Sequence, residues 1–331
     1  MDLAQLLGLI VGSLVFPGAF FVLALALLTQ YLMRKLSARY QRRMGPSYVG
    51  PLGILQPFYD LAKLLSAKEI VVSRDAMPRA AELFLLIGLA TASSSAILLP
   101  IGPFHVEGPY DFLVFFYMSS VMPAFMLVLA SLALPGPYTS LGVSRMLSMM
   151  SIGEPALFAG LLVPTFISTL RGIPLCVGEA SRSVGSLWLT PAGAAILALS
   201  LVGALVSLQA KVVAQPFDAP EAEQEIIAGF ATEFSGPLLA LASLLHDVEL
   251  AVTSLAISLV ILGGPSPYPW NSPLGALVAI AKYVAVVFAV TTLKNLMGRY
   301  RIEQALLQLF KYGLVPSMVA AGLATAYAMI A

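Results

Sequence analysis

The chain has 331 residues, of which 59% are hydrophobic and only 11% are charged, whereas charged residues make up about 25% of a soluble domain. So few charges cannot cover a water-facing surface, and the composition therefore excludes a soluble globular fold. The formal net charge of +1 gives no reason to expect nucleic acid as a partner.

Apolar segments long enough to cross a bilayer recur along the chain. Hydrocarbon about 30 Å thick requires roughly 20 helical residues. We predict eight spanning helices, over residues 6–33, 80–99, 112–134, 147–170, 190–208, 237–262, 274–293 and 305–328. Continuous apolar runs favour helices over the short alternating segments of a β-barrel. The predicted fold is all-α, a single polytopic membrane domain over residues 1–331.

The positions of Lys and Arg predict the orientation, because short cytoplasmic loops are enriched in them. Fourteen of the eighteen fall in alternate connections on one side, nine of them between residues 34 and 79. We expect the two long connections, residues 34–79 and 211–236, to be cytoplasmic and both termini to lie outside the cell membrane. The opposite connections are predicted to be simple connectors. Apolar residues at helical spacing between Leu52 and Leu65 predict a short amphipathic helix at the interface.

The second long connection is acidic. Five of the seventeen Asp and Glu residues lie there, namely Asp218, Glu221, Glu223, Glu225 and Glu233. Clustered carboxylates repel one another, which raises some of their pKa values and allows proton exchange near neutral pH. The alternative is a solvated acidic loop with helix-capping carboxylates.

Several titratable residues fall inside or at the edge of predicted spans, where an unpaired charge costs at least roughly 2.5–3.5 kcal/mol. They are Glu82, Glu154, His246, Asp247, Glu249, Lys282 and Lys311. Such residues usually face a protein interior or water, so they are candidates for a proton or ion path. His246 and Glu249, three residues apart on one helix face, form the strongest group together with Asp247. The alternative for Glu82 and Glu154 is a position among the lipid headgroups.

No catalytic constellation is present in the sequence. No Gly-rich phosphate loop follows a strand, no nucleophile elbow occurs, and the two histidines, His105 and His246, fall on different segments. The single cysteine, Cys176, excludes an internal disulfide and a multi-cysteine metal site. We therefore predict no metal site and no cofactor in this chain, and no redox step catalysed by it alone.

Three polar blocks carry a resemblance to a known family. The first runs from Arg42 to Asp60 and on to Glu69, the second from Pro216 to Gly236, and the third from Arg299 to Gln304, followed by Lys311 and Pro316. In this order they resemble the H-type membrane subunit of bacterial respiratory complex I. They also resemble its counterparts in membrane-bound nickel–iron hydrogenases and related ferredoxin-linked complexes. The resemblance covers essentially the whole chain.

By this resemblance, the chain is a non-catalytic subunit that anchors a redox arm and couples electron transfer to proton or sodium translocation. Its partners would be iron–sulfur and large hydrogenase-like subunits of the peripheral arm, antiporter-like membrane subunits, and lipid. Iron–sulfur clusters and, in hydrogenases, a nickel–iron centre would belong to those partners. The residues expected at the docking loops are Arg39, Arg42, Arg43, Gln56, Asp60, Lys63, Lys68, Glu69, Phe217, Arg299, Arg301 and Glu303.

Departures from the quinone-reducing members favour the hydrogenase-type or ferredoxin-linked branch. Those members carry Arg-Ala where this chain has Ala214-Gln215, and glutamates where it has Met33 and His246. Conversely, the segment from Gly45 to Pro51 is closer to the complex I spacing. The alternatives are a quinone-binding member of the same family, a stand-alone secondary transporter and a purely structural anchor. A transporter would show related halves with paired broken helices, and an anchor would leave the buried charges unexplained.

Overall fold

The computed structural model describes residues 11–102, 105–170, 172, 174–270 and 272–330. Eight helical segments are long and apolar enough to cross a membrane, which confirms the predicted all-α polytopic fold. They are Val11–Tyr40, Pro78–Leu98, Asp111–Leu132, Pro137–Leu170, Pro191–Lys211, Pro237–Ile261, Pro273–Leu296 and Ile302–Met329. Residues 6–10 of the first predicted span lie outside the described residues, as does Arg171.

The structure divides these spans and their connections into the following helices. They are α2 (Ala19–Tyr40), α3 (Gln56–Ser66), α4 (Pro78–Ser94), α5 (Asp111–Phe116), α6 (Met122–Leu132), α7 (Pro137–Leu170), α8 (Val177–Leu187), α9 (Pro191–Lys211), α10 (Glu223–Ile226), α11 (Pro237–Ala256), α12 (Pro273–Leu296), α13 (Ile302–Gln308) and α14 (Val315–Ile330). Segments of π-helix occur at Tyr117–Val121, Ile257–Ile261 and Leu309–Leu314. The first joins α5 to α6 and the last joins α13 to α14. Five spans begin at a proline, whose fixed φ and missing N–H suit the first helical turn.

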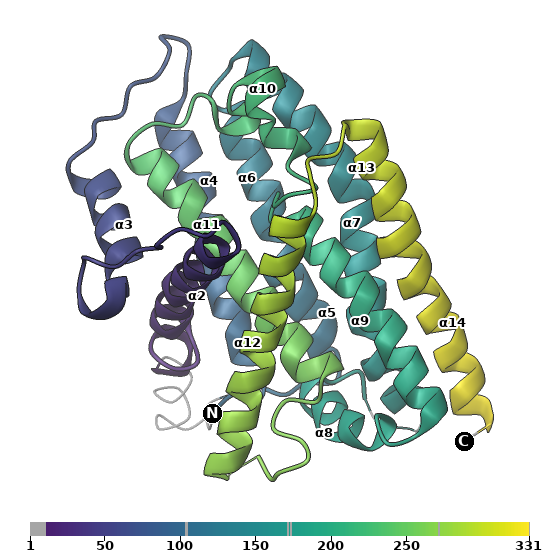
Figure 1. The fold of residues 1–331 in the computed structure, drawn as a ribbon. Coiled ribbons are helices and arrows are strands. Elements are labelled where there is room, and N and C mark those ends of the chain that lie inside the picture. The colour runs from purple at the N-terminus through teal and green to yellow at the C-terminus, as the bar shows by residue number, and fades with distance from the viewer. Residues whose placement is uncertain (1–10, 103–104, 171, 173, 271, 331) are drawn as a thin grey trace.

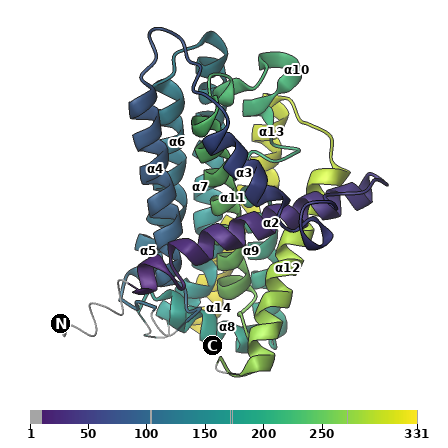
Figure 2. The ribbon, with the colours of Figure 1, turned by 90° about the vertical axis from the view of Figure 1, so that its left-hand side faces the viewer.

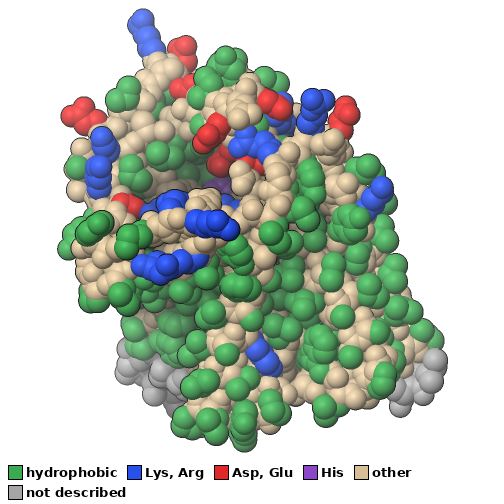
Figure 3. Space-filling view, in the orientation of Figure 1, with side chains coloured by type: hydrophobic (Ala, Val, Ile, Leu, Met, Phe, Trp, Pro, Cys, Tyr) green, Lys and Arg blue, Asp and Glu red, His purple; other side chains and the backbone are tan. Residues whose placement is uncertain are grey.

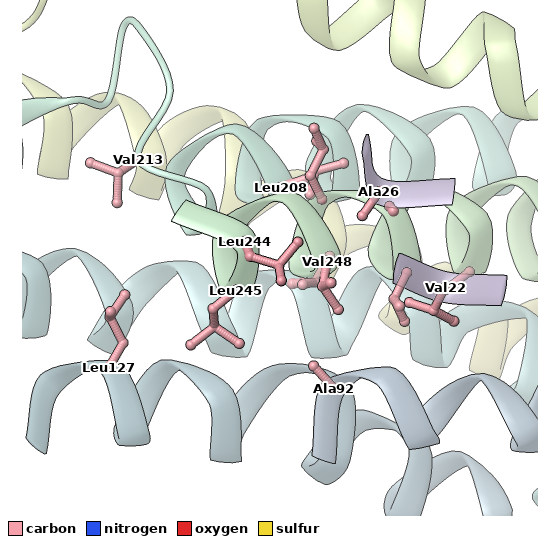
Figure 4. Close-up of a cluster of buried hydrophobic side chains, with 14 of the residues drawn as sticks. Val22, Ala26, Ala92, Leu127, Leu208, Val213, Leu244, Leu245 and Val248 are labelled. Carbon is pink, nitrogen blue, oxygen red and sulfur yellow. The ribbon is translucent and has the colours of Figure 1, made fainter. Parts of the chain in front are cut away.

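Helix α11 forms the centre of the bundle. In its most apolar window 83% of the residues are buried, compared with 22% for the span of α13 and α14. Figure 4 shows Leu244, Leu245 and Val248 of α11 among side chains of α2, α4, α6 and α9. The titratable trio predicted on this helix therefore lies in the most buried part of the membrane domain.

Helix α2 lies obliquely across the bundle, whereas α4 and α6 stand nearly upright (Figure 2). Hydrogen bonds join α2 to α12. The hydroxyl groups of Thr29 and Tyr283 lie 2.5 Å apart in the interior, and the Asn295 amide donates to Ser37 Oγ over 3.0 Å. Such polar contacts between spanning helices hold the oblique helix in place.

Several helix boundaries differ from the sequence prediction, among them the following three. Helix α2 continues to Tyr40 rather than ending at residue 33, so Arg39 lies on a helix and not in a docking loop. Helix α7 begins at Pro137 rather than at residue 147. Helix α9 ends at Lys211 rather than at residue 208. Hydropathy marks only the apolar part of a helix, because backbone hydrogen bonds continue after the chain leaves the hydrocarbon.

A helix also occurs where the sequence predicts only a connector. Helix α8 (Val177–Leu187) lies at the same end of the molecule as the last turn of α14, opposite α3 and α10 (Figure 1). Asp111 fixes its start, because its carboxylate accepts hydrogen bonds from the Val177 N–H over 2.8 Å and from the Cys176 thiol over 3.1 Å. Burial raises the pKa of the Cys176 thiol.

Candidate functional site

A buried group of charges lies where α7, α9 and α11 meet. Lys211 Nζ is 3.0 Å from Glu249 Oε1 and 3.2 Å from Glu154 Oε1. Ser120 presents its hydroxyl 2.9 Å and its carbonyl oxygen 3.2 Å from the same nitrogen, and the hydroxyl donates to Glu154. The side chains of Lys211 and Glu249 are only 3% and 2% exposed. We call Ser120, Glu154, Lys211 and Glu249 the ion cluster.

Local structure positions each member of the ion cluster. Lys211 is the last residue of α9, where the negative end of the helix dipole favours a cation. Ser120 belongs to the π-helical segment Tyr117–Val121, and π-bulges are frequent at functional sites. Two carboxylates and one ammonium group are neutral only when they share one further proton. The ion cluster can therefore exist with a net charge of 0 or −1.

A polar cavity of about 750 Å³ opens beside α11. Its volume lies within the range of roughly 300–1,000 Å³ that is typical of ligand sites. Its polar lining comprises Gln30, Arg34, Ser37, Gln41, Arg43, Gln56, Gln215, His246, Asp247, Lys294 and Asn295. Figure 3 shows a hollow in the upper half of this face, bordered by Lys and Arg below and by Asp and Glu above. Three cations and one carboxylate line the cavity, so an electron-rich or anionic group fits it best.

A smaller pocket of about 250 Å³ connects this cavity with the acidic segment. It shares six lining residues with the larger cavity, His246 and Asp247 among them, and it adds Glu221. Burial, reinforced by the neighbouring charge of Asp218, raises the pKa of Glu221 to about 7. Glu221 can therefore gain or lose a proton at neutral pH.

His246 links the two cavities to the ion cluster. Its Nδ1 lies 3.9 Å from Glu249 Oε2, and its ring packs against Phe230 with the ring centres 5.8 Å apart. Both ring nitrogens are buried, and neither forms a hydrogen bond with a described residue. An imidazole with unused nitrogens between a polar pocket and a carboxylate is suited to pass a proton.

The carboxylates of the acidic segment do not form one cluster, because they interact with different residues. Asp218 accepts hydrogen bonds from Arg299 Nε over 2.8 Å and from Nη2 over 2.6 Å. Glu225 pairs with Arg145 over 2.6 Å. These ion pairs fasten the acidic segment to α7 and to the connection before α13.

The remaining acidic residues of this segment have separate surroundings. Glu223 is exposed, and Glu233 lies beside Gly136. Of the five, only Glu221 lines one of the cavities described above. The predicted mutual repulsion therefore acts on Glu221, since the charge of Asp218 and, to a smaller extent, that of Glu223 contribute to its raised pKa.

Three further predicted path residues, Glu82, Lys282 and Lys311, belong neither to the ion cluster nor to the lining of the two cavities. Lys282 donates to the carbonyl oxygens of Leu262 and Ser266 over 2.7 and 2.8 Å, and so ties α12 to the connection before it. Glu82 on α4 and Lys311 in the last span are exposed. Neither forms an ion pair or a hydrogen bond with another residue of the described chain.

The predicted docking residues gather at the end of the molecule that carries α3 and α10 (Figure 1). Asp60 pairs with Arg34 over 2.5 Å and accepts from the Gln56 amide over 2.8 Å, which holds α3 against α2. The exposed members are Arg39, Arg42, Arg43, Lys63, Lys68, Glu69, Arg301 and Glu303. Phe217 is buried and packs edge-on against Tyr300, so it supports the surface from inside.

Two residues of the ion cluster, Lys211 and Ser120, are not among the path residues predicted from the sequence. Lys211 is counted there as a loop cation, although its place directly after the apolar run 190–208 is a signal that it can turn inward. Ser120 gives no signal, because a serine in an apolar helix commonly bonds to its own backbone. Their roles depend on the contact that the fold creates between α9, α7 and the π-helical segment Tyr117–Val121.

Comparisons with known proteins agree with this architecture. A family model described as NADH dehydrogenase matches residues 13–325. Among solved structures, the chain is similar to a chain of the membrane-bound sulfane sulfur reductase, an archaeal respiratory membrane complex. That similarity has a TM-score of 0.74 at 20% sequence identity, over 97% of this chain and 100% of the other. The family match confirms the resemblance seen in the polar blocks, and this multi-pass membrane protein belongs to the NADH dehydrogenase family, among the H-type membrane subunits of complex I and its relatives.

Proposed function

We propose that this chain is the membrane anchor and coupling subunit of a complex I-like oxidoreductase that translocates protons or sodium ions. One observation carries the proposal: His246 lines both polar cavities and lies 3.9 Å from Glu249 of the ion cluster. A route therefore runs from the acidic segment to charges buried between spanning helices. Membership of the family supports a place in such a complex.

The coupling we propose is electrostatic and conformational. A charge that appears beside the large cavity acts on Glu221 and His246 through a medium of low dielectric, where charges interact strongly. A proton passed through His246 to the ion cluster changes its net charge from −1 to 0. Lys211 then shifts between Glu249 on α11 and Glu154 on α7, because the protonated partner attracts it less.

We further propose that the end with α3 and α10 faces the cytoplasm and binds the peripheral iron–sulfur and large subunits. The connection between α2 and α3 is held in place for this role. Lys35 Nζ donates to the carbonyl oxygens of Pro46 and Leu52 over 2.8 and 3.2 Å. Beyond these anchors the apolar side chains of Met44 and Tyr48 are exposed, as expected of a surface that another subunit covers.

Ion translocation per electron tests the coupling role. Glu249→Gln removes a carboxylate of the ion cluster, whereas Glu82→Gln removes an exposed carboxylate of another span and is the matched control. In proteoliposomes containing the purified complex, we expect Glu249→Gln to retain electron transfer and to lose most ion translocation. Glu82→Gln should retain both. An unchanged ratio of ions to electrons in Glu249→Gln would contradict the proposal.

The wall of the large cavity supports an electron acceptor other than quinone. All three sequence departures from the quinone-reducing members, Met33, Ala214-Gln215 and His246, line this cavity. We therefore favour the hydrogenase-type or ferredoxin-linked branch. Quinone binding is the second candidate, because the cavity volume suits a ring of that size.

The electron acceptor can be identified on the complex purified through a tag on this chain. Nickel together with ferredoxin-driven hydrogen evolution supports the hydrogenase type. Turnover of sulfane sulfur without nickel supports a relative of the sulfur reductase. Reduction of a soluble quinone analogue that falls in Gln56→Ala, a cavity-wall variant, supports the second candidate.

A further inference from the structure

The last span is the least buried of the eight spans in the described chain. In its most apolar window 22% of the residues are buried, and the next lowest value is 33%. One face packs against α7 and α9 (Figure 1). This face carries the buried residues Gly313, Ser317, Ala320 and Ala324 at alternating spacings of four, three and four. The opposite face of the span is exposed in the described chain.

That opposite face has its own pattern. Its exposed residues are Lys311, Val315, Met318, Gly322 and Ala326, which recur at helical spacing. Apart from Gly322, its two chain neighbours and the backbone of its own helix turn, no heavy atom of the described residues lies within 4 Å of the position that a Cβ of Gly322 would take. Gly322 and Ala326 are four residues apart, a spacing of small residues that lets two spanning helices approach closely. We call these five residues, of which Lys311 belongs to the π-helical segment Leu309–Leu314 that precedes α14, the outer face of α14.

The outer face of α14 carries one charged residue, Lys311, which an ordinary lipid-facing surface lacks. It is exposed and forms no hydrogen bond or ion pair with any described residue, whereas Lys211 binds carboxylates and Lys282 binds carbonyl oxygens. It lies nine residues after the start of the span at Ile302, which is about 14 Å along the helix. An unpaired charge inside a bilayer is costly, so a carboxylate on a neighbouring helix would stabilise Lys311 at this position.

We propose that the outer face of α14 is an interface with a spanning helix of another membrane subunit, and that this helix carries an Asp or Glu opposite Lys311. A carboxylate supplies the missing charge, and a close helix approach over Gly322 and Ala326 supplies the packing. The inference deepens the proposed function by giving the surface and chemistry of one membrane partner, and it rests on that function because it requires a multisubunit complex.

A second copy of this chain does not satisfy the same requirement. Two copies in one membrane, related by a two-fold axis along the membrane normal, would place both Lys311 side chains at the same depth. Like charges in a medium of low dielectric repel strongly. The only acidic residue of the span is Glu303, two turns closer to its start. The partner helix therefore belongs to a different chain.

Photo-crosslinking and charge reversal test the inference in the native complex. Benzoylphenylalanine replaces Met318, and the complex is crosslinked in membranes and then purified through a tag on this chain. We expect an adduct with an apolar helix of another subunit that carries an Asp or Glu. Lys311→Glu should lower recovery of that subunit about tenfold or more, whereas the matched control Lys311→Arg should retain it.

Two further variants keep the test decisive. Because a buried glutamate can itself impair insertion, Lys311→Met is measured too, and we expect a smaller loss of the subunit. Changing the partner's carboxylate to Lys in the Lys311→Glu background should restore recovery. Crosslinks to lipid alone, with full recovery in Lys311→Glu, would overturn the inference in favour of a lysine that reaches the headgroups.

The remaining outcomes separate this inference from the proposed function. Crosslinks to a second copy of this chain would overturn the inference alone. Loss of ion translocation in Glu249→Gln, together with full subunit recovery in Lys311→Glu, would also reject only the inference. Recovery of the wild-type chain without any other subunit would reject both the inference and the proposed function.

Discussion

Neighbouring carboxylates of the acidic segment show how burial and pairing decide the chemistry of single residues. Asp218 and Glu221 are three residues apart, but Arg299 binds only Asp218. Glu221 is left in a pocket with a raised pKa. Glu223, two residues further on, is exposed. Among the acidic residues of this segment, only Glu221 combines a place in the lining of the proposed path with a protonation change at neutral pH.

The pH dependence of stability should report Glu221. Its pKa rises from the ordinary value of 4.5 to about 7 in the folded protein, so folding favours the protonated form. Below about pH 4.5 the wild type and the Gln variant should have the same free energy of unfolding. As the pH rises from about 4.5 to about 7, that of the wild type falls below that of the variant, and above about pH 7 the difference stays constant. Glu221→Gln should therefore match the wild type at pH 4.5 and exceed it at pH 8, by at most about 3 kcal/mol.

Thermal unfolding in detergent at both pH values measures this effect. Glu223→Gln is the control, because it removes an exposed charge from the same segment. A pH-dependent gain of equal size in Glu223→Gln would attribute the effect to the net charge of the segment rather than to Glu221.

At the scale of elements, single polar contacts fix helices that hydropathy does not mark. Asp111, the first residue of α5, holds the start of α8, which lies far along the chain. In the same way, Ser235 binds the backbone of Val71 over 2.8 Å in both directions, joining the two long connections. Such contacts leave no periodic signal in the sequence.

Removing Asp111 should loosen α8. Asp111→Ala leaves the buried Val177 N–H without its acceptor, which costs about 1–3 kcal/mol. Cys176 is the single cysteine of the chain, so maleimide labelling reports this site alone. We expect slow labelling in the wild type and faster labelling in Asp111→Ala. Ser186→Ala on the exposed side of α8 should label like the wild type, and equal rates in all three proteins would contradict the prediction.

The molecule as a whole has two unlike ends. Charged residues gather in the upper half of the view in Figure 3, and the lower half is mostly apolar. Helix α2 runs obliquely between the charged half and the apolar half, and its residues form part of the cavity wall. Subunits that exchange electrons are therefore expected at one end only.

A pair of exposed apolar residues at opposite ends tests this polarity. Tyr48 is 96% exposed near α3, and Leu189 is 85% exposed just after α8. Tyr48→Glu should weaken binding of the peripheral subunits, because a buried interface would have to take up an unpaired charge. Leu189→Glu should leave binding intact. Quantitative mass spectrometry of the purified complex measures both, and equal loss of peripheral subunits would contradict the assignment of the docking end.

The sequence by itself determined the class of this protein. Spanning helices must satisfy their backbone within one segment, so long apolar runs predict them with little dependence on tertiary contacts. The amphipathic helix α3 follows from periodicity in the same way. The polar blocks from Arg42 to Asp60 and from Pro216 to Glu225 identified the family, because they are too specific to arise from apolar composition.

Only the tertiary structure decided which charges act together. Lys211, Glu154 and Glu249 come from three helices that are distant in sequence, and no local pattern shows that they meet. Burial also separated Glu221 from its acidic neighbours, and the packing of the last span left Lys311 exposed and without a partner among the described residues. The reason is physical: a span is defined by local hydrogen bonds and apolar contact with lipid, whereas the state of a charge depends on every group the fold places around it.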